Sequence, residues 1–223
     1  MFVARRQSQS DTEAALRAYF SAKAAVVAAG FSAEIDYHAQ LNFDAIQERD
    51  FLREAAWVIL SSGMRESVIA QKFPGISDAF LNWTSSEEIV AEKACCRTAA
   101  LAVFRHVPKV EAILEVASIV AIEGFEAVRR NVEKYGPHHL ERFGFIGPTT
   151  SLHLAKNLGL DFVKPDRHLV RIASALGYKT ADELCQEVAR ELGERACIVD
   201  VVFWRFATLN SDYIASLTGF VRL

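Results

Sequence analysis

The sequence predicts an all-α protein. Apolar residues recur at helical spacing along almost the whole chain, glycine and proline separate these stretches, and no stretch has the period-two alternation and hairpin turns of β-strands. The 223 residues, 51% of them hydrophobic, suffice for a large buried core in one large or two small domains. Segments near the two termini could also pack together around the middle of the chain, which would give two helical lobes.

Capping and stop residues predict the helices of the first half. Ser10-x-x-Glu13 has the pattern of a capping box, and apolar positions continue from it to Gly30. Residues 50–62 are apolar almost all round, so we expect this helix in the core, ending at Gly63. The further helices predicted here are a short piece before Pro74, a helix that begins at Ser85 or Ser86, and helices over 94–107 and 108–122.

The second half is divided in the same way. A helix over 122–134 is expected to stop at Tyr135-Gly136-Pro137, because glycine and proline break helices. The turn GFIGPTT, residues 144–150, leads into a helix over 149–158 that stops at Gly159. The remaining predicted helices cover 165–177, 181–192 with the cap Thr180-x-x-Glu183, and the strongly apolar stretch 194–209.

Composition indicates a cytoplasmic protein without a membrane partner. The four cysteines (Cys95, Cys96, Cys185 and Cys197) have neither zinc-ligand nor CxxC spacing, which is typical of reduced core residues. No apolar run approaches the ~20 residues that cross a bilayer, and MFVARRQSQS has too few apolar residues for a secretory signal. We therefore expect the cytosol or nucleoid of a bacterial type of cell.

The stretch VKPDRHLVRIA, residues 163–173, joins an amphipathic helix to an unusual start. Pro165 suits the first helical turn, where its missing N–H costs nothing. Asp166 places a carboxylate at the positive end of the helix, beside Lys164 and Arg167. Asp166 is therefore either a simple helix start or a carboxylate held there for chemistry.

A candidate anion site precedes this stretch. The turn with Gly144 and Gly147 can direct backbone N–H groups outward at the start of the next helix, where Thr149 and Thr150 add hydroxyl groups. Residues 151–180 carry five Lys or Arg and two Asp, a net charge of +3 in a chain whose net charge is −3. A charge cluster of this size is typical of a solvated face as well as of a DNA contact, so charge alone does not decide between them.

The order of these features resembles the helix-hairpin-helix DNA glycosylase superfamily, which has an endonuclease III-like fold. The matching positions are Ile146-Gly147 in the hairpin and Pro165-Asp166-Arg167-His168 after it. FLREAAWVILSSGMRES resembles the core helix and following loop of the family, and VDVVFWRFATL its closing helix. The resemblance spans about 45–210 and is most specific over 143–173.

The resemblance implies a fold of two lobes with a cleft between them. One lobe would contain roughly 50–135, and the other would be formed by 1–49 with 136–223, including the hairpin 143–159 and the Asp166 loop. The chain would bind, as a monomer, double-stranded DNA that contains a modified base. The hairpin would hold the phosphate backbone through Gly144, Phe145, Ile146, Gly147, Thr149 and Thr150.

The resemblance also implies that Asp166 is the catalytic carboxylate. Cleavage of an N-glycosidic bond builds positive charge on the deoxyribose as the base leaves, and a fixed carboxylate stabilises that charge and can orient the attacking water. The target nucleotide first has to be flipped out of the duplex. His168 and Lys164 are candidates for a supporting role, although a structural hydrogen bond is the favoured interpretation of His168 and Lys164 could simply face solvent.

Departures from the family pattern refine the predicted activity. Members with lyase activity have a hairpin lysine, and Thr149 occupies that position, 17 residues before Asp166, so a monofunctional glycosylase is expected. Only Cys197 lies near the position of the family's four-cysteine iron–sulfur cluster, so no cluster is expected. Gly144 and Phe145 replace the proline and first glycine of the family's PGVG or PGIG turn. No metal site is predicted, apart from a monovalent cation (Na⁺ or K⁺) that hairpin carbonyls hold in some members.

Further candidates line the surface that would meet DNA. Met64 or Arg65 would fill the gap left by the flipped base, and ordinary helix-end residues are the alternative. Trp57, Trp83 and Tyr37 could form the base pocket, although Trp57 lies on an apolar helix typical of a core. Two alternatives to a repair glycosylase remain: an anti-phage enzyme that excises hypermodified bases, and a non-catalytic protein that binds distorted DNA.

Overall fold

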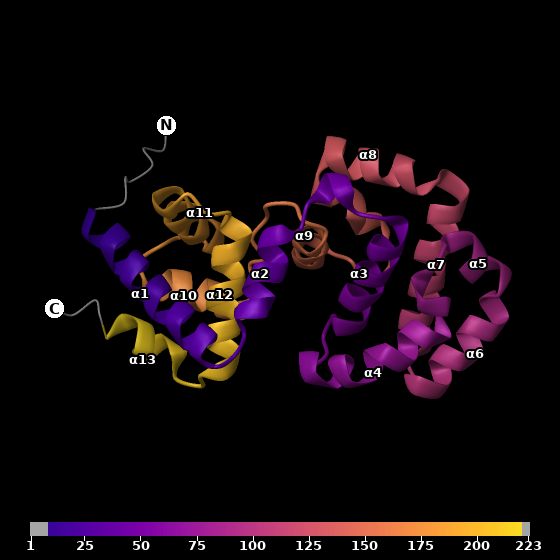
Figure 1. Ribbon diagram of the computed structural model, residues 1–223, viewed down its shortest axis with the longest axis horizontal. Coiled ribbons are helices and arrows are strands. Elements are labelled where there is room, and N and C mark those ends of the chain that lie inside the picture. The colour runs from indigo at the N-terminus through magenta and orange to yellow at the C-terminus, as the bar shows by residue number, and fades with distance from the viewer. Residues whose placement is uncertain (1–8, 220–223) are drawn as a thin grey trace. The chain divides into compact units, whose positions relative to one another are not determined.

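The computed structural model describes residues 9–219, and every regular element in that range is helical, which confirms the all-α class (Figure 1). No helix in this range is long and apolar enough to span a membrane. Residues 1–8, in which we looked for a secretory signal, lie outside the described range. The α-helices (α) and 3-10 helices (η) are α1 (Gln9–Ala28), α2 (Ser32–Gln40), η1 (Phe43–Ala45), α3 (Glu48–Ser61), α4 (Glu66–Ala79), η2 (Leu81–Trp83), α5 (Ser86–Ala91), α6 (Lys93–Val103), α7 (Val107–Glu123), α8 (Phe125–Tyr135), η3 (Pro137–Arg142), α9 (Pro148–Asn157), α10 (Arg167–Ala175), α11 (Ala181–Leu192), α12 (Ala196–Leu209) and α13 (Tyr213–Thr218).

The chain divides into two compact units. Unit 1 combines Met1–Leu41 with Gly159–Leu223, and unit 2 is Asn42–Leu158. Unit 1 thus includes segments from both halves of the chain, and its boundaries differ from those of the expected lobe. Residues 42–49 and 136–158, expected with the termini, belong to unit 2.

The hairpin segment belongs to unit 2 because its apolar side chains are buried there. Phe143 is buried, and its ring centroid lies 6.0 Å from that of Phe51 in α3. The helix that follows, α9, packs on α3, and its last residue, Asn157, donates a hydrogen bond of 2.9 Å to Oε2 of Glu54. These contacts are distant in sequence, so the local pattern of the hairpin did not predict them.

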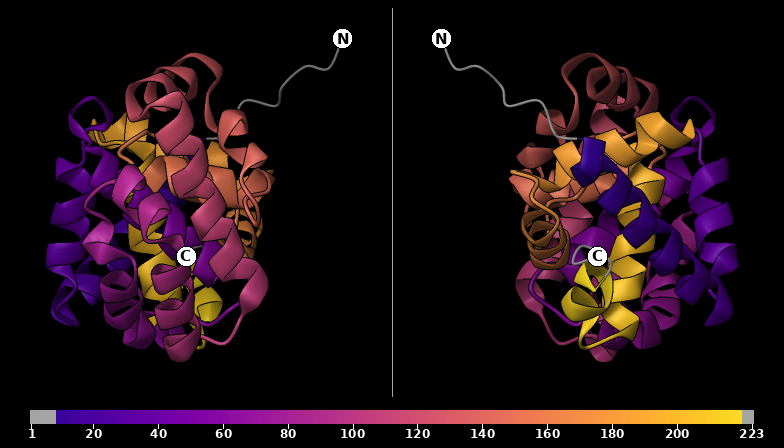
Figure 2. Two further views of the ribbon diagram at one scale, coloured as in Figure 1. Left: turned by 90° about the vertical axis from the view of Figure 1, so that its right-hand side faces the viewer. Right: turned by 90° about the vertical axis from the view of Figure 1, so that its left-hand side faces the viewer.

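Unit 1 is built around α12, which packs against α1, α2, α10 and α11. The helix is apolar on all sides, and most of its residues are buried. Helix α1 lies on it through small side chains, and the buried Tyr19 forms an edge-to-face contact with Phe203 at 5.7 Å. The Tyr19 hydroxyl and the Lys23 ammonium both donate to the carboxylate of Glu194, and burial raises the pKa of Tyr19. Figure 2 (right panel) shows α1 and α13 side by side in this unit.

Unit 2 is built around α3 and α7, which pack on each other (Figure 1). Helices α5, α6 and α8 cover α7, while α4 and α9 cover α3. The predicted stop before Pro74 is wrong, because α4 continues through Pro74 to Ala79. An interior proline costs a helix up to ~3 kcal/mol. Packing along α6 offsets this cost, since α4 approaches so closely that a Cβ on Gly75 would lie 3.3 Å from the side chain of Val103.

A left-handed turn follows α4 and directs Trp83 into the core. Leu81, Asn82 and Trp83 all have positive φ, which costs an L-residue roughly 1–2 kcal/mol each. In return, the Trp83 ring stacks on Phe80 at 5.0 Å and on Phe73 at 6.0 Å. Its indole N–H donates to Oγ of Ser77 at 3.0 Å, and its side chain is 2% exposed. Trp83 therefore has no open face for an extruded base, which corrects its assignment to the base pocket.

Candidate functional site

The hairpin of unit 2 is a tight turn anchored at both ends. The N–H of Ile146 donates to the carbonyl of Phe143 at 3.1 Å, and both side chains are buried. Between them, Gly144 faces α7 so closely that a Cβ on it would lie 3.1 Å from Cβ of Ala112. The glycine is needed here for close packing of the turn against α7, since its φ is not in the left-handed region.

Gly144→Ala should destabilise the protein by about 1–2 kcal/mol, because the added methyl overpacks the contact with Ala112. Urea unfolding measures the change. In an Ala112→Gly background the same substitution should cost almost nothing, although Ala112→Gly itself costs about 1 kcal/mol in helix propensity. Gly147→Ala is the matched control, since a Cβ there meets no atom within 4 Å. Equal losses at Gly144 in both backgrounds would contradict this assignment.

Phe145 occupies the tip of the turn with φ of 65°. Positive φ is uncommon for residues other than glycine and is generally costly for bulky ones. The backbone at the tip of the turn therefore has a conformation that suits glycine, although the residue is phenylalanine. The ring is 40% exposed and forms an edge-to-face contact with His106 at 6.0 Å.

The start of α9 offers backbone donors. The N–H of Gly147 donates to Oγ1 of Thr150 at 2.7 Å, and that hydroxyl lies 3.1 Å from the carbonyl of Gly147. The Thr150 hydroxyl is thus engaged within the turn, which corrects its predicted role as a free donor. Among the described residues no acceptor is recorded for the amides of Thr149 and Thr150, as is usual at a helix N-terminus. With the helix dipole, these two amides and the exposed Thr149 favour an anion.

The loop between α3 and α4 carries the two candidates for filling the gap in DNA. Gly63 has φ of 69° and ends α3, as its position in the sequence predicted. Met64 is 40% exposed, and Arg65 is exposed as the residue before α4. Both side chains are therefore available at the surface of unit 2, and their proposed role stays a prediction.

Asp166 begins α10 in unit 1. Its Oδ1 accepts the N–H groups of His168 at 2.8 Å and Leu169 at 3.1 Å, so it is the N-cap and the predicted helix start is confirmed. Pro165 precedes the cap rather than occupying the first turn, because Asp166 has extended backbone angles. No hydrogen bond within the described range is recorded for Oδ2, and the residue is half-buried.

Three side chains missed in the sequence fix the segment that leads to Asp166. Arg195 donates to the carbonyls of Gly159 at 2.6 Å and Leu41 at 3.0 Å. Asp161 accepts the N–H of Cys197 at the start of α12 at 2.8 Å. The buried Asp200 of α12 accepts the N–H of Lys164 at 2.6 Å. The one signal in the sequence for Asp200 is its charge within the otherwise apolar run 196–204.

The backbone of Lys164 connects Asp200 to Asp166 through two hydrogen bonds. The carbonyl of Lys164 accepts the N–H of Asp166 at 2.8 Å, which closes a tight turn around Pro165. The same peptide segment is therefore held by Asp200 on one side and by the cap of α10 on the other. Lys164 contributes its main chain to this arrangement, and a phosphate contact of its side chain stays a prediction.

His168 forms a structural hydrogen bond. Arg167 Nε donates to His168 Nε2 at 3.3 Å, so His168 Nδ1 carries the proton and donates to the hydroxyl of Tyr213 at 3.2 Å. Burial lowers the pKa of His168 more than the carboxylate of Asp166 raises it, so the imidazole is neutral near pH 7. The ring ties the start of α10 to α13, which supports the loop of Asp166.

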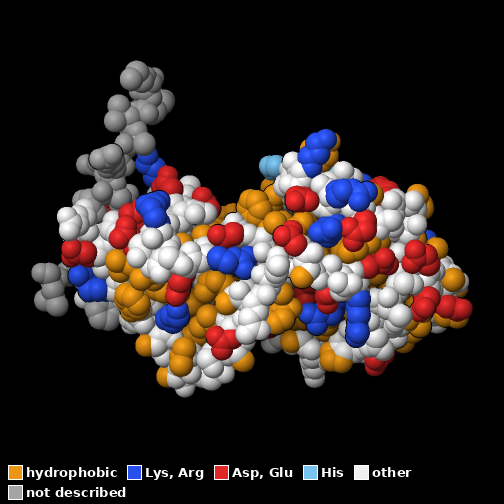
Figure 3. Space-filling view, turned by 45° about the horizontal axis from the view of Figure 1, so that its top comes forward, with side chains coloured by type: hydrophobic (Ala, Val, Ile, Leu, Met, Phe, Trp, Pro, Cys, Tyr) orange, Lys and Arg blue, Asp and Glu red, His pale blue; other side chains and the backbone are white. Residues whose placement is uncertain are grey.

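The basic segment 151–180 is divided between the two units. Lys156 is buried in α9 of unit 2, whereas Arg167, Arg171 and Lys179 are exposed in unit 1. On the face drawn in Figure 3, Lys and Arg side chains are interspersed with Asp and Glu. Of the five cations that give this segment its net charge of +3, Lys156 is therefore not available at the surface.

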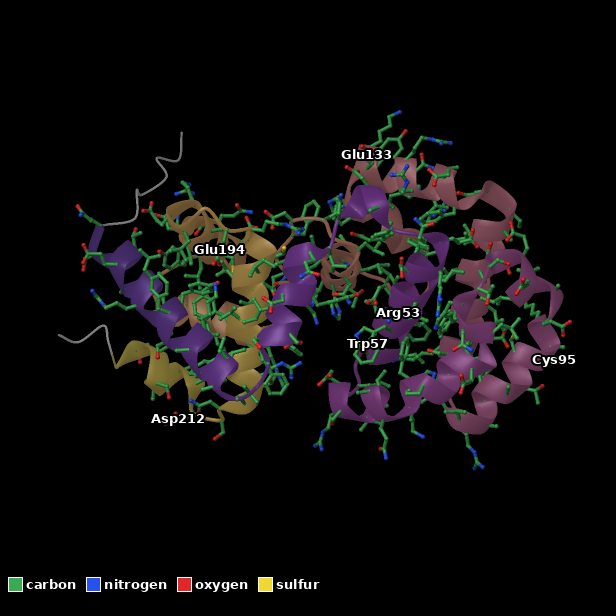
Figure 4. All side chains as sticks on the ribbon, viewed as in Figure 1. Arg53, Trp57, Cys95, Glu133, Glu194 and Asp212 are labelled. Atoms are coloured by element: carbon green, nitrogen blue, oxygen red, sulfur yellow. The ribbon has the colours of Figure 1, made fainter. Side chains whose placement is uncertain are left out.

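Trp57 and Tyr37 remain as aromatic candidates for the base pocket. Trp57 is half-buried in α3 and meets Phe73 edge to face at 5.0 Å. Figure 4 shows Arg53 and Trp57 on the same side of α3. Burial raises the pKa of the neighbouring Glu54. The hydrogen bonds that Arg53 and Asn157 donate to its two carboxylate oxygens act in the opposite direction but are weaker.

Tyr37 lies in unit 1, exposed on α2. The site residues predicted from the sequence are thus distributed over both units: the hairpin, the loop of Met64 and Trp57 in unit 2, and Asp166, His168 and Lys164 with Tyr37 in unit 1. No group of three or more His, Cys, Asp or Glu that could hold a metal ion occurs within residues 9–219. No protein-family model, curated protein or solved structure matches the chain.

Proposed function

We propose that the protein is a monofunctional DNA N-glycosylase that removes a damaged or modified base from duplex DNA and leaves an abasic site. Asp166 is its catalytic carboxylate, the hairpin of unit 2 binds the phosphate backbone, and the loop with Met64 and Arg65 contacts the distorted duplex. The protein would act in base excision repair, as a monomer in the cytoplasm.

The backbone of the hairpin is the observation that carries this proposal. Phe145 adopts the left-handed conformation that glycine has in turns of this kind, and α9 begins three residues later. The surface above Gly147 is open, since a Cβ there would meet no atom within 4 Å. A phosphate can therefore approach the backbone closely enough to accept from the amides of Thr149 and Thr150.

The cap geometry of Asp166 supports a catalytic role. Only Oδ1 takes the hydrogen bonds that begin α10, so Oδ2 can face a positively charged sugar or accept a proton from water. In the reaction, the base departs with the electron pair of the N-glycosidic bond, water adds its oxygen to the sugar carbon, and the released proton passes to Asp166 and then to solvent. Thr149 cannot form a Schiff base, so no strand cleavage is expected.

Three carbonyls of the hairpin already face donors of the protein itself. The carbonyl of Phe143 accepts from Ile146 at 3.1 Å, and that of Gly147 accepts from Ser151 at 2.8 Å. The carbonyl of Phe145 lies 3.4 Å from the Thr150 hydroxyl. Because each of these oxygens already faces a protein donor, we derive no step through a cation.

An excision assay on duplexes with oxidised, alkylated, deaminated and hypermodified bases tests the proposal. Alkali-labile abasic sites should form on at least one class, without strand cleavage before alkali and without trapping by borohydride. Excision confined to hypermodified bases would assign the enzyme to defence against foreign DNA. Duplex binding without excision on any substrate would favour the non-catalytic alternative, and no binding at all would contradict the proposal.

Gly147→Ala should weaken DNA binding by roughly 10-fold while leaving stability unchanged. The methyl meets no atom of the free protein but would occupy the space that a phosphate needs above the turn. Fluorescence anisotropy with a duplex containing a tetrahydrofuran abasic-site analogue, at fixed salt, measures the affinity. The matched control is Gly136→Ala, at a second open position between α8 and η3, which should lose stability because of its φ of 72° but keep its affinity per folded molecule. Equal affinities of Gly147→Ala and wild type would remove the hairpin as the phosphate site.

A further inference from the structure

Lys109 is a buried lysine in unit 2. Its side chain is 3% exposed at the start of α7, and burial lowers the pKa of the ammonium group. Lysine is almost never buried unless it is paired, because removing its charge from water costs free energy. The contacts of this ammonium therefore show which interactions offset the cost of its burial.

The ammonium holds the end of α3. It donates to the carbonyl of Leu60 at 2.6 Å and to the carbonyl of Ser62 at 2.5 Å. Carbonyls at a helix C-terminus lack partners within the helix and favour a cation. Ser62 is also the first residue of the loop 62–65, so Lys109 fixes the point from which Met64 and Arg65 extend.

The same ammonium contacts the hairpin. It lies 5.7 Å from the centroid of the Phe145 ring, within the range of a cation–π interaction. The His106 ring packs against another side of Phe145, and its Nδ1 accepts the N–H of Lys109 at 3.3 Å to cap α7. The strained tip of the hairpin is thereby held from the start of α7 by two neighbouring side chains.

Lys109 therefore contacts both the loop 62–65 and the hairpin tip at Phe145, and each of these segments has side chains exposed to solvent. Met64 and Phe145 each leave 40% of their surface accessible. Arg65 is exposed next to Met64 in the sequence, and Arg105 is exposed next to His106, whose ring contacts Phe145. Apolar side chains flanked by arginines are the combination that proteins insert into a base stack that has been opened. An intact duplex offers these side chains no gap.

We infer that Lys109 is a positioning residue that fixes the loop 62–65 and Phe145 as one rigid surface for duplex DNA with an opened base stack. The coupling of the two segments is a property of the free protein. The identity of the partner rests on the proposed function. The surface favours a duplex that lacks a base over an intact duplex of the same sequence, because Met64 and Phe145 enter the gap together.

Lys109→Met tests the coupling in the free protein. It preserves the length of the side chain but removes the donors, and amide hydrogen exchange should become roughly 10-fold faster at both 62–65 and 144–147. Lys72→Met is the matched control, since Lys72 of α4 likewise donates to a helix-end carbonyl, that of Val103, at 3.0 Å. Exchange that stays slow at either segment in Lys109→Met, or rises equally there in Lys72→Met, would overturn the inference.

The preference of the protein for a duplex with a missing base over an intact duplex tests the proposed DNA-binding surface. Lys109→Met should reduce the preference for a duplex containing tetrahydrofuran over an intact duplex by roughly 10-fold, a change that lower stability alone does not produce. An unchanged preference would overturn the positioning role. A wild-type protein that shows no preference refutes the proposed partner, while the exchange measurement still decides the coupling.

A double-mutant cycle covers the case in which Lys109→Met does not fold. Met64→Ala and Phe145→Leu change exposed side chains, so both variants should fold. Their losses of affinity for the tetrahydrofuran duplex should be non-additive by roughly 3-fold or more if the two side chains act as one surface. Strictly additive losses would overturn the inference.

Discussion

We expect Asp166→Asn to lower the rate of base excision by roughly 10³-fold, with the free energy of unfolding within about 0.5 kcal/mol of wild type. Asparagine retains an oxygen that can accept the N–H groups of His168 and Leu169, so α10 keeps its cap. A neutral amide neither stabilises the charge that develops on the sugar nor takes a proton from water. Single-turnover excision on the best substrate of the panel, with urea unfolding in parallel, measures both quantities.

Two variants that each remove a helix N-cap distinguish a loss of catalysis from a loss of stability. Asp166→Ala removes the cap as well as the charge and should lose about 1 kcal/mol of stability together with the activity. Thr180→Ala removes an equivalent cap, because Oγ1 of Thr180 accepts the N–H of Glu183 at 3.0 Å at the start of α11. It should lose similar stability and keep its excision rate per folded molecule. An Asp166→Asn variant with more than a tenth of the wild-type rate would exclude Asp166 as the catalytic carboxylate.

Local signals in the sequence predicted the helices and the start of α10 because the residues that cap and stop a helix lie beside it. Asp166 lies at the start of α10 as predicted, although as the N-cap rather than within the first turn, and Gly63 ends α3 as expected. Two short helices were not predicted: α2, which is polar on most sides, and α13, which has six residues. Neither contains enough periodic apolar positions to be recognised.

Contacts between distant segments explain what the sequence did not predict. Trp83 was a candidate for the base pocket, but a left-handed turn places its ring against Phe73 and Phe80. The hairpin joined unit 2 through Phe143, and Lys109 gave no sign of being buried. In each case the contacting residues lie outside the local segment, and periodicity and capping patterns carry information only about that segment.

Asp200→Ala should lower the excision rate by roughly 10- to 100-fold although Asp200 is not itself a catalytic residue. The N–H of Lys164 loses the acceptor 2.6 Å away that holds the segment before Asp166 against α12. A displacement of about 1 Å in a catalytic group is enough for a loss of this size. Stability should fall as well, by about 1–3 kcal/mol, because a part-buried donor loses its partner.

Two further variants distinguish positioning of Asp166 from general weakening of unit 1. Asp200→Asn keeps an acceptor for the N–H of Lys164 and should stay within about 3-fold of the wild-type rate. Asp161→Ala removes the acceptor of the Cys197 N–H from the same segment, farther along the chain from Asp166, and should lose stability with a smaller loss of rate. Since the proposed phosphate contacts lie in unit 2, any loss of rate in these variants should appear in kcat, with DNA affinity near that of wild type. If Asp200→Ala instead weakened DNA binding and kept its kcat, Asp200 would not act through the position of Asp166.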